Sequence, residues 1–221
     1  MGLSIVLVSG GLDSAVTAAI AAGEGEVAFL HANYSQRTEA RELRAFTEIA
    51  DFFKVEKRLI VELGYLKEIG GSALFDNGVE VPEGDLESKE VPVTYVPFRN
   101  AHLLSVAVSW AEVLGAMSIY IGAVEEDSSG YPDCRDEFFR SFESTARLGT
   151  KDATVVEIKT PLIEMKKAEI VKKGASVNTP FNLTWSCYKA SDLACGRCDS
   201  CMLRLRGFKE AGLIDPIPYK E

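Results

Sequence analysis

Short apolar runs alternate with longer amphipathic stretches through most of this chain. The apolar runs predict buried strands at residues 4–8, 27–33, 58–61, 118–121 and 155–159. The stretches between them have helical spacing, and we expect helices at residues 13–22, 37–53, 100–114, 137–146 and 164–173, the last ended by Gly174. Strands that alternate with such helices predict an α/β fold, an open parallel five-stranded sheet with helices on both faces.

This regular pattern is interrupted twice. Residues 70–92 are polar and contain Gly and Pro, a composition too charged for a core and a length too great for a plain connection. They predict a flap over a site. After Pro180 the chain becomes rich in cysteine and ends with one more helical stretch, residues 201–211. We therefore predict a core of residues 1–178 and a C-terminal appendage of residues 179–221 that packs on it.

Composition narrows the class of protein. Hydrophobic residues make up 47% of the 221 residues and charged residues 26%, as in ordinary globular proteins. The net charge of −9 argues against a partner as large and anionic as a nucleic acid. No apolar run approaches the ~20 residues of a membrane span, and no cationic segment precedes the first strand. We expect a cytoplasmic protein with no membrane partner.

A glycine-containing loop joins the first strand to the first helix. Its sequence, Val8-Ser9-Gly10-Gly11-Leu12-Asp13-Ser14, offers backbone N–H groups, two hydroxyls and a helix N-terminus to one anion. A P-loop would need a lysine that is missing here. The pattern therefore favours an enzyme that grips pyrophosphate and cleaves ATP between its α and β phosphates. The alternative is a serine-capped helix after a tight turn.

Four of the five cysteines form a cluster near the C-terminus. Cys187, Cys195, Cys198 and Cys201 follow the spacing C-x7-C-x2-C-x2-C. Four thiolates this close favour a tetrahedral Zn²⁺ site, with Lys189, Arg197 and Arg204 offsetting its negative charge. An iron–sulfur cluster is the main alternative, although the ferredoxin spacing would need a cysteine where Leu205 stands. With four sulfur ligands the metal would have no open position, so we expect a structural site.

Further candidates lie after the predicted strands, at the edge where open α/β sheets bind ligands. Asp133 and Arg135 are candidates for a guanine-like base and an anion, or else an ion pair and helix cap. Arg99 and Asn100 are candidates for contacting phosphates, or else form a solvated helix start. Either Lys166 or Lys167 is a candidate for neutralising departing pyrophosphate, the alternative being a lysine on a solvated face. Tyr34 and Gln36 would flank adenine. We expect Cys134, His31 and His102 to be buried or at the rim of the site, without a chemical role.

Several segments together resemble a known family. The segments S-G-G-L-D-S, Y-S-Q-R, Y-V-P-F-R-N, S-G-Y-P-D-C-R-D-E-F, T-P-L with K-A-E following, and C-Y…C-x2-C-x2-C-x-L-R occur in this order. The order resembles the 7-cyano-7-deazaguanine synthase family across nearly the whole chain. That family belongs to the N-type ATP pyrophosphatases, with an adenine nucleotide alpha hydrolase-like, Rossmann-like fold. The chain departs from it at Phe98, where glycine is usual, at Ser35, and in the first cysteine gap, which is one residue short.

The resemblance implies a carbon–nitrogen ligase of queuosine and archaeosine biosynthesis. Such an enzyme converts 7-carboxy-7-deazaguanine and ammonia to the nitrile by two adenylations, releasing AMP and pyrophosphate. It also implies roles for particular residues. Ser9, Gly10, Gly11, Asp13 and Ser14 would hold the phosphates and Mg²⁺, Lys167 would stabilise negative charge, Asp133 and Arg135 would recognise the deazapurine, and one structural Zn²⁺ and a homodimer are expected.

Two other functions are compatible with the sequence. A tRNA thiolase also combines this loop with cysteine clusters, although the acidic composition and the lack of an RNA-binding extension argue against it. A nucleotide-sensing module whose appendage docks a partner would bind ATP without turnover. Products that depend on the carboxylated deazaguanine would distinguish these functions.

Overall fold

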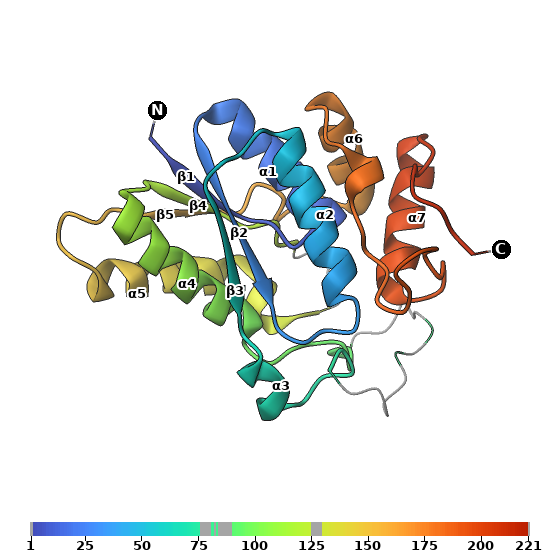
Figure 1. Cartoon of the computed structure of the whole chain (residues 1–221), viewed down its shortest axis with the longest axis horizontal. Helices are drawn as coiled ribbons and strands as arrows, with labels where there is room; N and C mark the ends of the chain where they lie inside the picture. Colours follow the sequence, from blue (N-terminus) through green and yellow to red (C-terminus); the bar gives the residue numbers. More distant parts are fainter. Residues whose placement is uncertain (1, 76–80, 82, 84–89, 125–129, 221) are drawn as a thin grey trace.

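A computed structural model describes residues 2–75, 81, 83, 90–124 and 130–220. Its centre is a five-stranded sheet in the order β3-β2-β1-β4-β5, with every neighbouring pair parallel (Figure 1). The strands are β1 (Ser4–Leu7), β2 (Val27–Asn33), β3 (Arg58–Glu62), β4 (Ser118–Tyr120) and β5 (Glu157–Lys159). The predicted five-stranded parallel sheet is confirmed.

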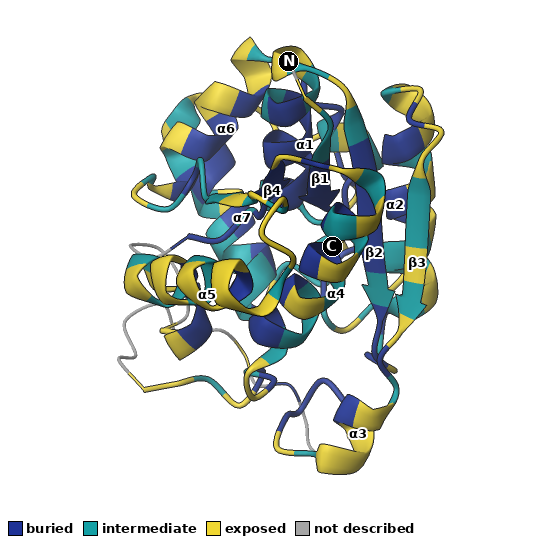
Figure 2. Cartoon of the chain, turned by 90° about the vertical axis from the view of Figure 1, so that its left-hand side faces the viewer, coloured by how far each residue is buried: buried dark blue, intermediate teal, exposed yellow. Residues whose placement is uncertain are grey.

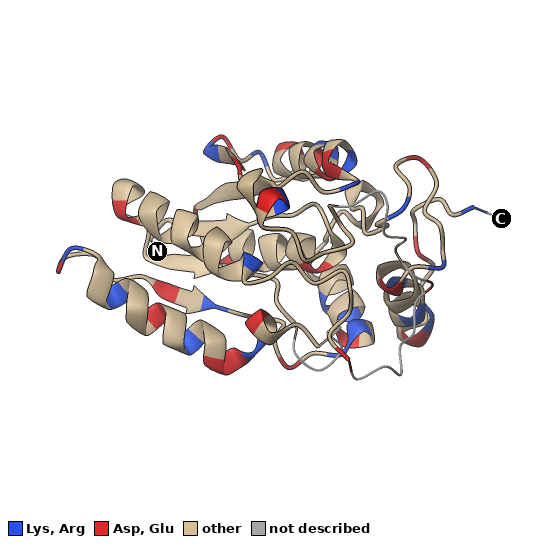
Figure 3. Ribbon diagram, turned by 90° about the horizontal axis from the view of Figure 1, so that it is seen from below, with Lys and Arg blue, Asp and Glu red and all other residues tan. Residues whose placement is uncertain are grey.

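Helices cover both faces of this sheet. Four helices do so, namely α1 (Leu12–Glu24), α2 (Glu39–Phe52), α4 (Arg99–Leu114) and α5 (Asp136–Gly149). Alternate residues of β1 separate the two cores: Ile5 packs in the cluster with α4 and α5, and Val6 in the cluster with α1 and α2. Strands β1, β2 and β4 carry no Asp, Glu, Lys or Arg, whereas acidic and basic residues alternate over the outer helices (Figure 3). Figure 2 shows the buried centre and exposed outer surfaces.

The strand order reverses at β1, which has β2 on one side and β4 on the other. At such a point the connections leave in opposite directions and open a crevice at the carboxyl end of the sheet. Gly122, just past β4, allows β4 and α1 to approach closely. A Cβ at Gly122 would lie 2.9 Å from the backbone of Asp13 and from Thr17 Oγ1. The fold thus places a crevice directly at the start of α1.

The C-terminal residues pack against this core through α6 (Lys167–Ser176) and α7 (Asp199–Ala211). Phe208 of α7 lies in one apolar cluster with Leu12 and Val16 of α1 and Ile170 of α6. Arg204 is 2% exposed and donates to both carboxylate oxygens of Asp215, at 2.7 and 2.9 Å. This buried pair ties α7 to the C-terminal tail. In Figure 1 α6 and α7 lie beside α1 and α2.

The elements differ from the predicted ones in several places. A short helix α3 (Tyr65–Ile69) and two 3-10 turns, η1 (Pro132–Cys134) and η2 (Phe181–Leu183), were not expected. The helix predicted at 164–173 begins at Lys167 and continues through Gly174 to Ser176, so Gly174 does not end it. Helix α7 starts at Asp199 rather than at residue 201. Most of the predicted flap lies outside the described residues. None of the helices in the described ranges has the length and apolar character needed to cross a membrane.

Candidate functional site

A cavity of about 290 Å³ occupies the crevice at the carboxyl end of the sheet. Three parts of the chain line it: the loop before α1, the ends of β2 and β4 with the start of α4, and the C-terminal unit, by which we mean residues 179–221. Most of the predicted nucleotide-binding residues reach this cavity, namely Val8, Ser9, Gly11, Leu12, Asp13, Ser14, Tyr34, Gln36, Arg99, Asn100 and Lys167. The fold therefore brings together residues that are far apart in the sequence.

The loop before α1 has the geometry of an anion cradle. Gly10 has φ +91°, and a Cβ there would lie 2.7 Å from the carbonyl oxygen of Glu42, so only glycine fits. The Oγ atoms of Ser9 and Ser14 lie 3.1 Å apart, and Ser14 donates to the carbonyl of Gly11 at 3.0 Å. Helix α1 has no side-chain cap, so its first N–H groups stay available to an anion.

A lysine from the other end of the chain completes the cradle. Lys167 Nζ lies 2.8 Å from both carboxylate oxygens of Asp13, although the two residues are 154 positions apart. Lys167 is the first residue of α6 and its side chain is 11% exposed. The neighbouring Lys166 is exposed. Position in the sequence left open which lysine reaches the phosphates, the family resemblance implied Lys167, and the structure brings Lys167 to the cavity.

The far wall of the cavity is aromatic and carries a partly buried cation. Tyr34, Tyr131 and Tyr188 line it together with Arg99. Arg99 Nη1 donates to the hydroxyl of Tyr34 at 3.1 Å, and Arg99 Nε is buried with no hydrogen-bond partner among the described residues. Burial raises the pKa of Tyr34 to about 12, so this phenol is neutral near pH 7. Such a wall suits a flat ring with an anionic substituent.

Asp133 and Arg135 do not line this cavity. The carboxylate of Asp133 accepts from the backbone N–H of Asn100 at 2.9 Å, and Asn100 Nδ2 donates to the carbonyl of Asp133 at 2.8 Å. Burial raises the pKa of Asp133. Arg135 is exposed and directly precedes α5. These contacts match the helix-cap alternative for Asp133, and recognition of a base by either residue stays a prediction.

The four clustered cysteines are arranged as the ligands of a closed metal site would be. Their Sγ atoms all lie within 4.8 Å of one another, and those of Cys195 and Cys201 are 3.9 Å apart. Zn–S bonds of ~2.3 Å would place the sulfurs of a tetrahedron about 3.8 Å apart. The donor set fits zinc and leaves no position open to a substrate.

One predicted feature of the metal site is wrong. Arg204 was expected to offset the charge of the thiolates, but its guanidinium is engaged by Asp215 and by Thr184 Oγ1, which is 2.7 Å away. The predictions for the two histidines and for Cys134 agree with the structure. His31 is buried against Val8 and Phe46, His102 lies beside Tyr65, and Cys134 is buried with its pKa raised to about 11 by desolvation.

Several residues of the cavity were not singled out from the sequence. These are Arg37, Glu42, Tyr131, Trp185, Ser186 and Tyr188. Arg37 and Tyr131 belong to motifs that were recognised, Y-S-Q-R and S-G-Y-P-D-C-R, so their motifs were the available signal. Trp185 and Tyr188 flank the first cysteine ligand. Nothing in the sequence indicated that the C-terminal unit, which carries the four cysteines, also forms a wall of the nucleotide cavity.

Comparison with known proteins yields a family and a set of relatives. The model of the family "Queuosine biosynthesis protein QueC" matches residues 3–212. The chain is 58% identical to the 7-cyano-7-deazaguanine synthase of Chloroherpeton thalassium, over 98% of this chain and 96% of that protein. It is 52% identical to that of Nautilia profundicola, over the full length of both. Among solved structures, NMN synthetase from Francisella tularensis matches with a TM-score of 0.49 at 16% identity, over 96% of this chain and 73% of that one.

Proposed function

The chain belongs to the QueC family of queuosine biosynthesis proteins, and we propose that it is an ATP-dependent ligase that makes 7-cyano-7-deazaguanine. Its substrates would be 7-carboxy-7-deazaguanine, ammonia and ATP. One structural observation carries the proposal. A cradle without a P-loop lysine is completed by Lys167, whose ammonium lies 2.8 Å from both oxygens of Asp13 at the N-terminus of α1.

The chemistry explains why ATP is needed twice. A carboxylate oxygen is a poor leaving group, so in the first step it attacks the α-phosphorus of ATP and displaces pyrophosphate. Ammonia then attacks the acyl adenylate, AMP leaves, and an amide forms after loss of a proton. In the second step the amide oxygen is adenylated in the same way. Loss of a second AMP and of the remaining N–H protons leaves the C≡N bond, and each AMP carries one former carboxylate oxygen.

The residues of the cradle fit these steps without a nucleophile from the protein. The N–H groups at the start of α1 and the hydroxyls of Ser9 and Ser14 would bind phosphate oxygens. Lys167 would stabilise the charge that develops on the departing pyrophosphate. Asp13 retains oxygen lone pairs beside Lys167, and this carboxylate would hold Mg²⁺, which would supply positive charge to the phosphates.

The aromatic wall would bind the flat rings. We assign Tyr34 and Gln36 to the adenine, as their place after β2 suggests, and Arg99 and Asn100 to the phosphate side of the nucleotide. Tyr131 and Tyr188 remain for the deazapurine. Arg99 Nε has no hydrogen-bond partner within the part of the chain that the structure describes, which supports an anionic contact at this wall. The cysteine site would hold one structural Zn²⁺, since all four ligand positions are filled by sulfur.

An oxygen-labelling experiment tests the reaction. Zinc-loaded protein is incubated with ATP, ammonium and 7-carboxy-7-deazaguanine labelled with ¹⁸O in its carboxylate, and the products are analysed by mass spectrometry. We expect the nitrile, with two AMP per nitrile, each carrying one ¹⁸O. Release of ADP, or a lack of nitrile and amide from active-site-titrated protein, would overturn the proposal. Sulfur transfer to tRNA would indicate that the protein is a tRNA thiolase. ATP binding without turnover would indicate a nucleotide-sensing module.

We also propose that the protein works in the cytoplasm as a homodimer on small-molecule substrates only. The dimer follows from the family resemblance. Light scattering coupled to size-exclusion chromatography tests it, and a mass of one chain at micromolar concentration would contradict it. A tRNA mobility-shift assay tests the expected lack of nucleic-acid binding, for which the net charge of −9 is the physical support.

A further inference from the structure

The backbone of the C-terminal unit, which carries the four cysteines, is hydrogen bonded directly to the phosphate cradle, the loop of residues 9–14. The N–H of Trp185 donates to the carbonyl of Gly10 at 2.8 Å. Gly10 is also held from its other side, because its α-carbon packs against Glu42 and Ala45 of α2. The conformation of the cradle therefore depends on where residue 185 lies. Trp185 stands two positions before Cys187, the first cysteine of the metal site.

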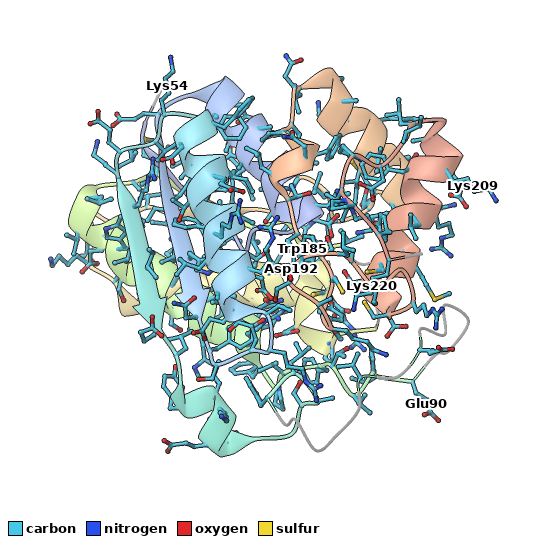
Figure 4. The ribbon with its side chains drawn as sticks, turned by 45° about the vertical axis from the view of Figure 1, so that its right-hand side comes forward. Lys54, Glu90, Trp185, Asp192, Lys209 and Lys220 are labelled. Atoms are coloured by element: carbon cyan, nitrogen blue, oxygen red, sulfur yellow. The ribbon has the colours of Figure 1, made fainter. Side chains whose placement is uncertain are left out.

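The indole of Trp185 is hydrogen bonded inside the C-terminal unit. It is 2% exposed, and its Nε1 donates at 3.0 Å to the carbonyl of Ala190, in the loop between the ligands Cys187 and Cys195. The guanidinium of Arg41, from α2, lies 4.6 Å from the indole centroid on the core side. Trp185 thus touches the metal-binding loop and the core at once. Figure 4 shows it in the interior, between the ribbon of the core and that of the C-terminal unit.

A second anchor fixes the same segment from α7. Arg204 donates to Thr184 Oγ1 at 2.7 Å and to Ser186 Oγ at 3.4 Å, so the residues on both sides of Trp185 are held by one buried guanidinium. Helix α7 itself begins directly after the ligand Cys198 and contains the ligand Cys201. A metal ion bound by the four sulfurs would fix the start of α7 and residue 187. Both constraints reach Gly10 through Trp185.

We propose that Trp185 is a positioning residue that couples the cysteine metal site to the phosphate cradle, so that zinc and ATP bind with positive cooperativity. Zinc bound at the cysteines would hold the Trp185 N–H on Gly10 and keep the cradle in its binding form. Because coupling between binding sites is reciprocal, ATP must then tighten zinc binding by the same factor. The inference rests on the proposed function only in taking ATP as the ligand of the cradle.

The experiment measures zinc affinity of the full-length protein by competition with a chromogenic chelator, with and without saturating Mg-ATP. We expect ATP to lower the zinc Kd of the wild type about tenfold, within the range usual for coupled sites. In Trp185→Ala this factor should fall to about one while one zinc per chain is still bound. Trp185→Phe keeps a ring beside Arg41 and should retain most of the coupling.

Trp110 provides the matched control. It is the only other tryptophan in the sequence and lies partly buried on α4, on the opposite face of the sheet. Trp110→Ala should keep the tenfold factor, and a titration of zinc, ATP and chelator without protein corrects for zinc held by ATP itself. The inference is overturned if ATP leaves the wild-type zinc Kd unchanged, or if Trp185→Ala responds like the wild type. Equilibrium dialysis separates the two claims, since a wild type that binds no ATP also overturns the proposed function.

Discussion

Lys167 and Lys166 are adjacent lysines in different surroundings. Lys167 is buried against Asp13, and Lys166 is exposed. We predict that Lys167→Met, which keeps the length of the side chain and removes its charge, lowers kcat for pyrophosphate release about 100- to 1,000-fold, as expected for loss of one group that stabilises developing charge. Lys166→Met should stay within about twofold of the wild type. Equal losses in both variants would show that Lys167 has no special place in the reaction.

Cys134 is the one cysteine outside the metal site, and it lines the cavity. Burial raises its pKa from 9.0 to about 11, so the reactive thiolate is scarce until the pH approaches that value. We predict that iodoacetamide alkylates Cys134 in zinc-loaded protein at pH 8 about 100-fold more slowly than a free cysteine of unshifted pKa. Peptide mass spectrometry measures the rate, and the urea-unfolded, chelated protein is the control. Fast modification at pH 8 would contradict the burial seen here.

Among single residues, the sequence predicted those whose roles follow from their neighbours along the chain. The cradle from Ser9 to Ser14 is contiguous, and its strand–loop–helix context fixes where its N–H groups point. By position Lys167 was one of two candidate lysines and only the family resemblance singled it out, because burial against Asp13 depends on how α6 packs. Trp185 was missed for the same reason. Its hydrogen bond to Gly10 joins residues 175 positions apart, and no periodicity encodes such a contact.

Packing between α6 and α7 determines where Lys167 lies. Gly207 of α7 faces the stem of Lys167, and a Cβ there would lie 2.5 Å from Lys167 Cγ and 3.2 Å from its backbone carbon. We predict that Gly207→Ala displaces the ammonium from Asp13 and lowers kcat at least about tenfold, since a misplacement of about 1 Å costs up to ~100-fold. Zinc content should stay at one per chain.

Gly23 of α1 is the matched control for Gly207, because a Cβ at Gly23 meets no atom within 4 Å. Gly23→Ala should leave activity unchanged and stabilise the protein slightly, as alanine does within a helix. Steady-state kinetics and thermal melting measure both variants. Full activity of Gly207→Ala would mean that Lys167 adjusts without loss, and the proposed link between α7 and the cradle would then be wrong.

The same kind of contact explains which elements the sequence could not predict. Glycine usually ends a helix, yet α6 runs through Gly174, where a Cβ would lie 2.5 Å from the ring of Phe181. Close packing, rather than a helix end, requires glycine there. The strands were predicted well because both faces of a parallel sheet are buried, which leaves continuous apolar runs in the sequence. The order of the strands in the sheet was not predicted, because it depends on contacts between whole elements.

At the scale of the whole molecule, the residues after 178 share apolar clusters with the rest of the chain. The cysteines share one apolar cluster with Ala45 of α2 and with Ala73, and Phe208 shares another with α1 and α6. Removal of the C-terminal residues would therefore expose the interior of the core as well as the metal site. Small appendages usually depend on their metal to fold. Here the reverse dependence also holds, because the core relies on the appendage to cover α1 and α6.

This sharing leads to a prediction for unfolding. In a Trp110→Phe variant Trp185 is the sole tryptophan and reports the C-terminal unit, whereas far-UV circular dichroism reports mainly the helices of the core. We expect the two probes to give one urea midpoint for the zinc-loaded protein, because neither unit can lose its contacts without exposing the clusters of the other. An earlier midpoint for Trp185 fluorescence would mean that the appendage unfolds alone and that the shared clusters contribute little. If chelation of zinc shifts both midpoints together, the metal stabilises the whole molecule through the same contacts that join Trp185 to Gly10.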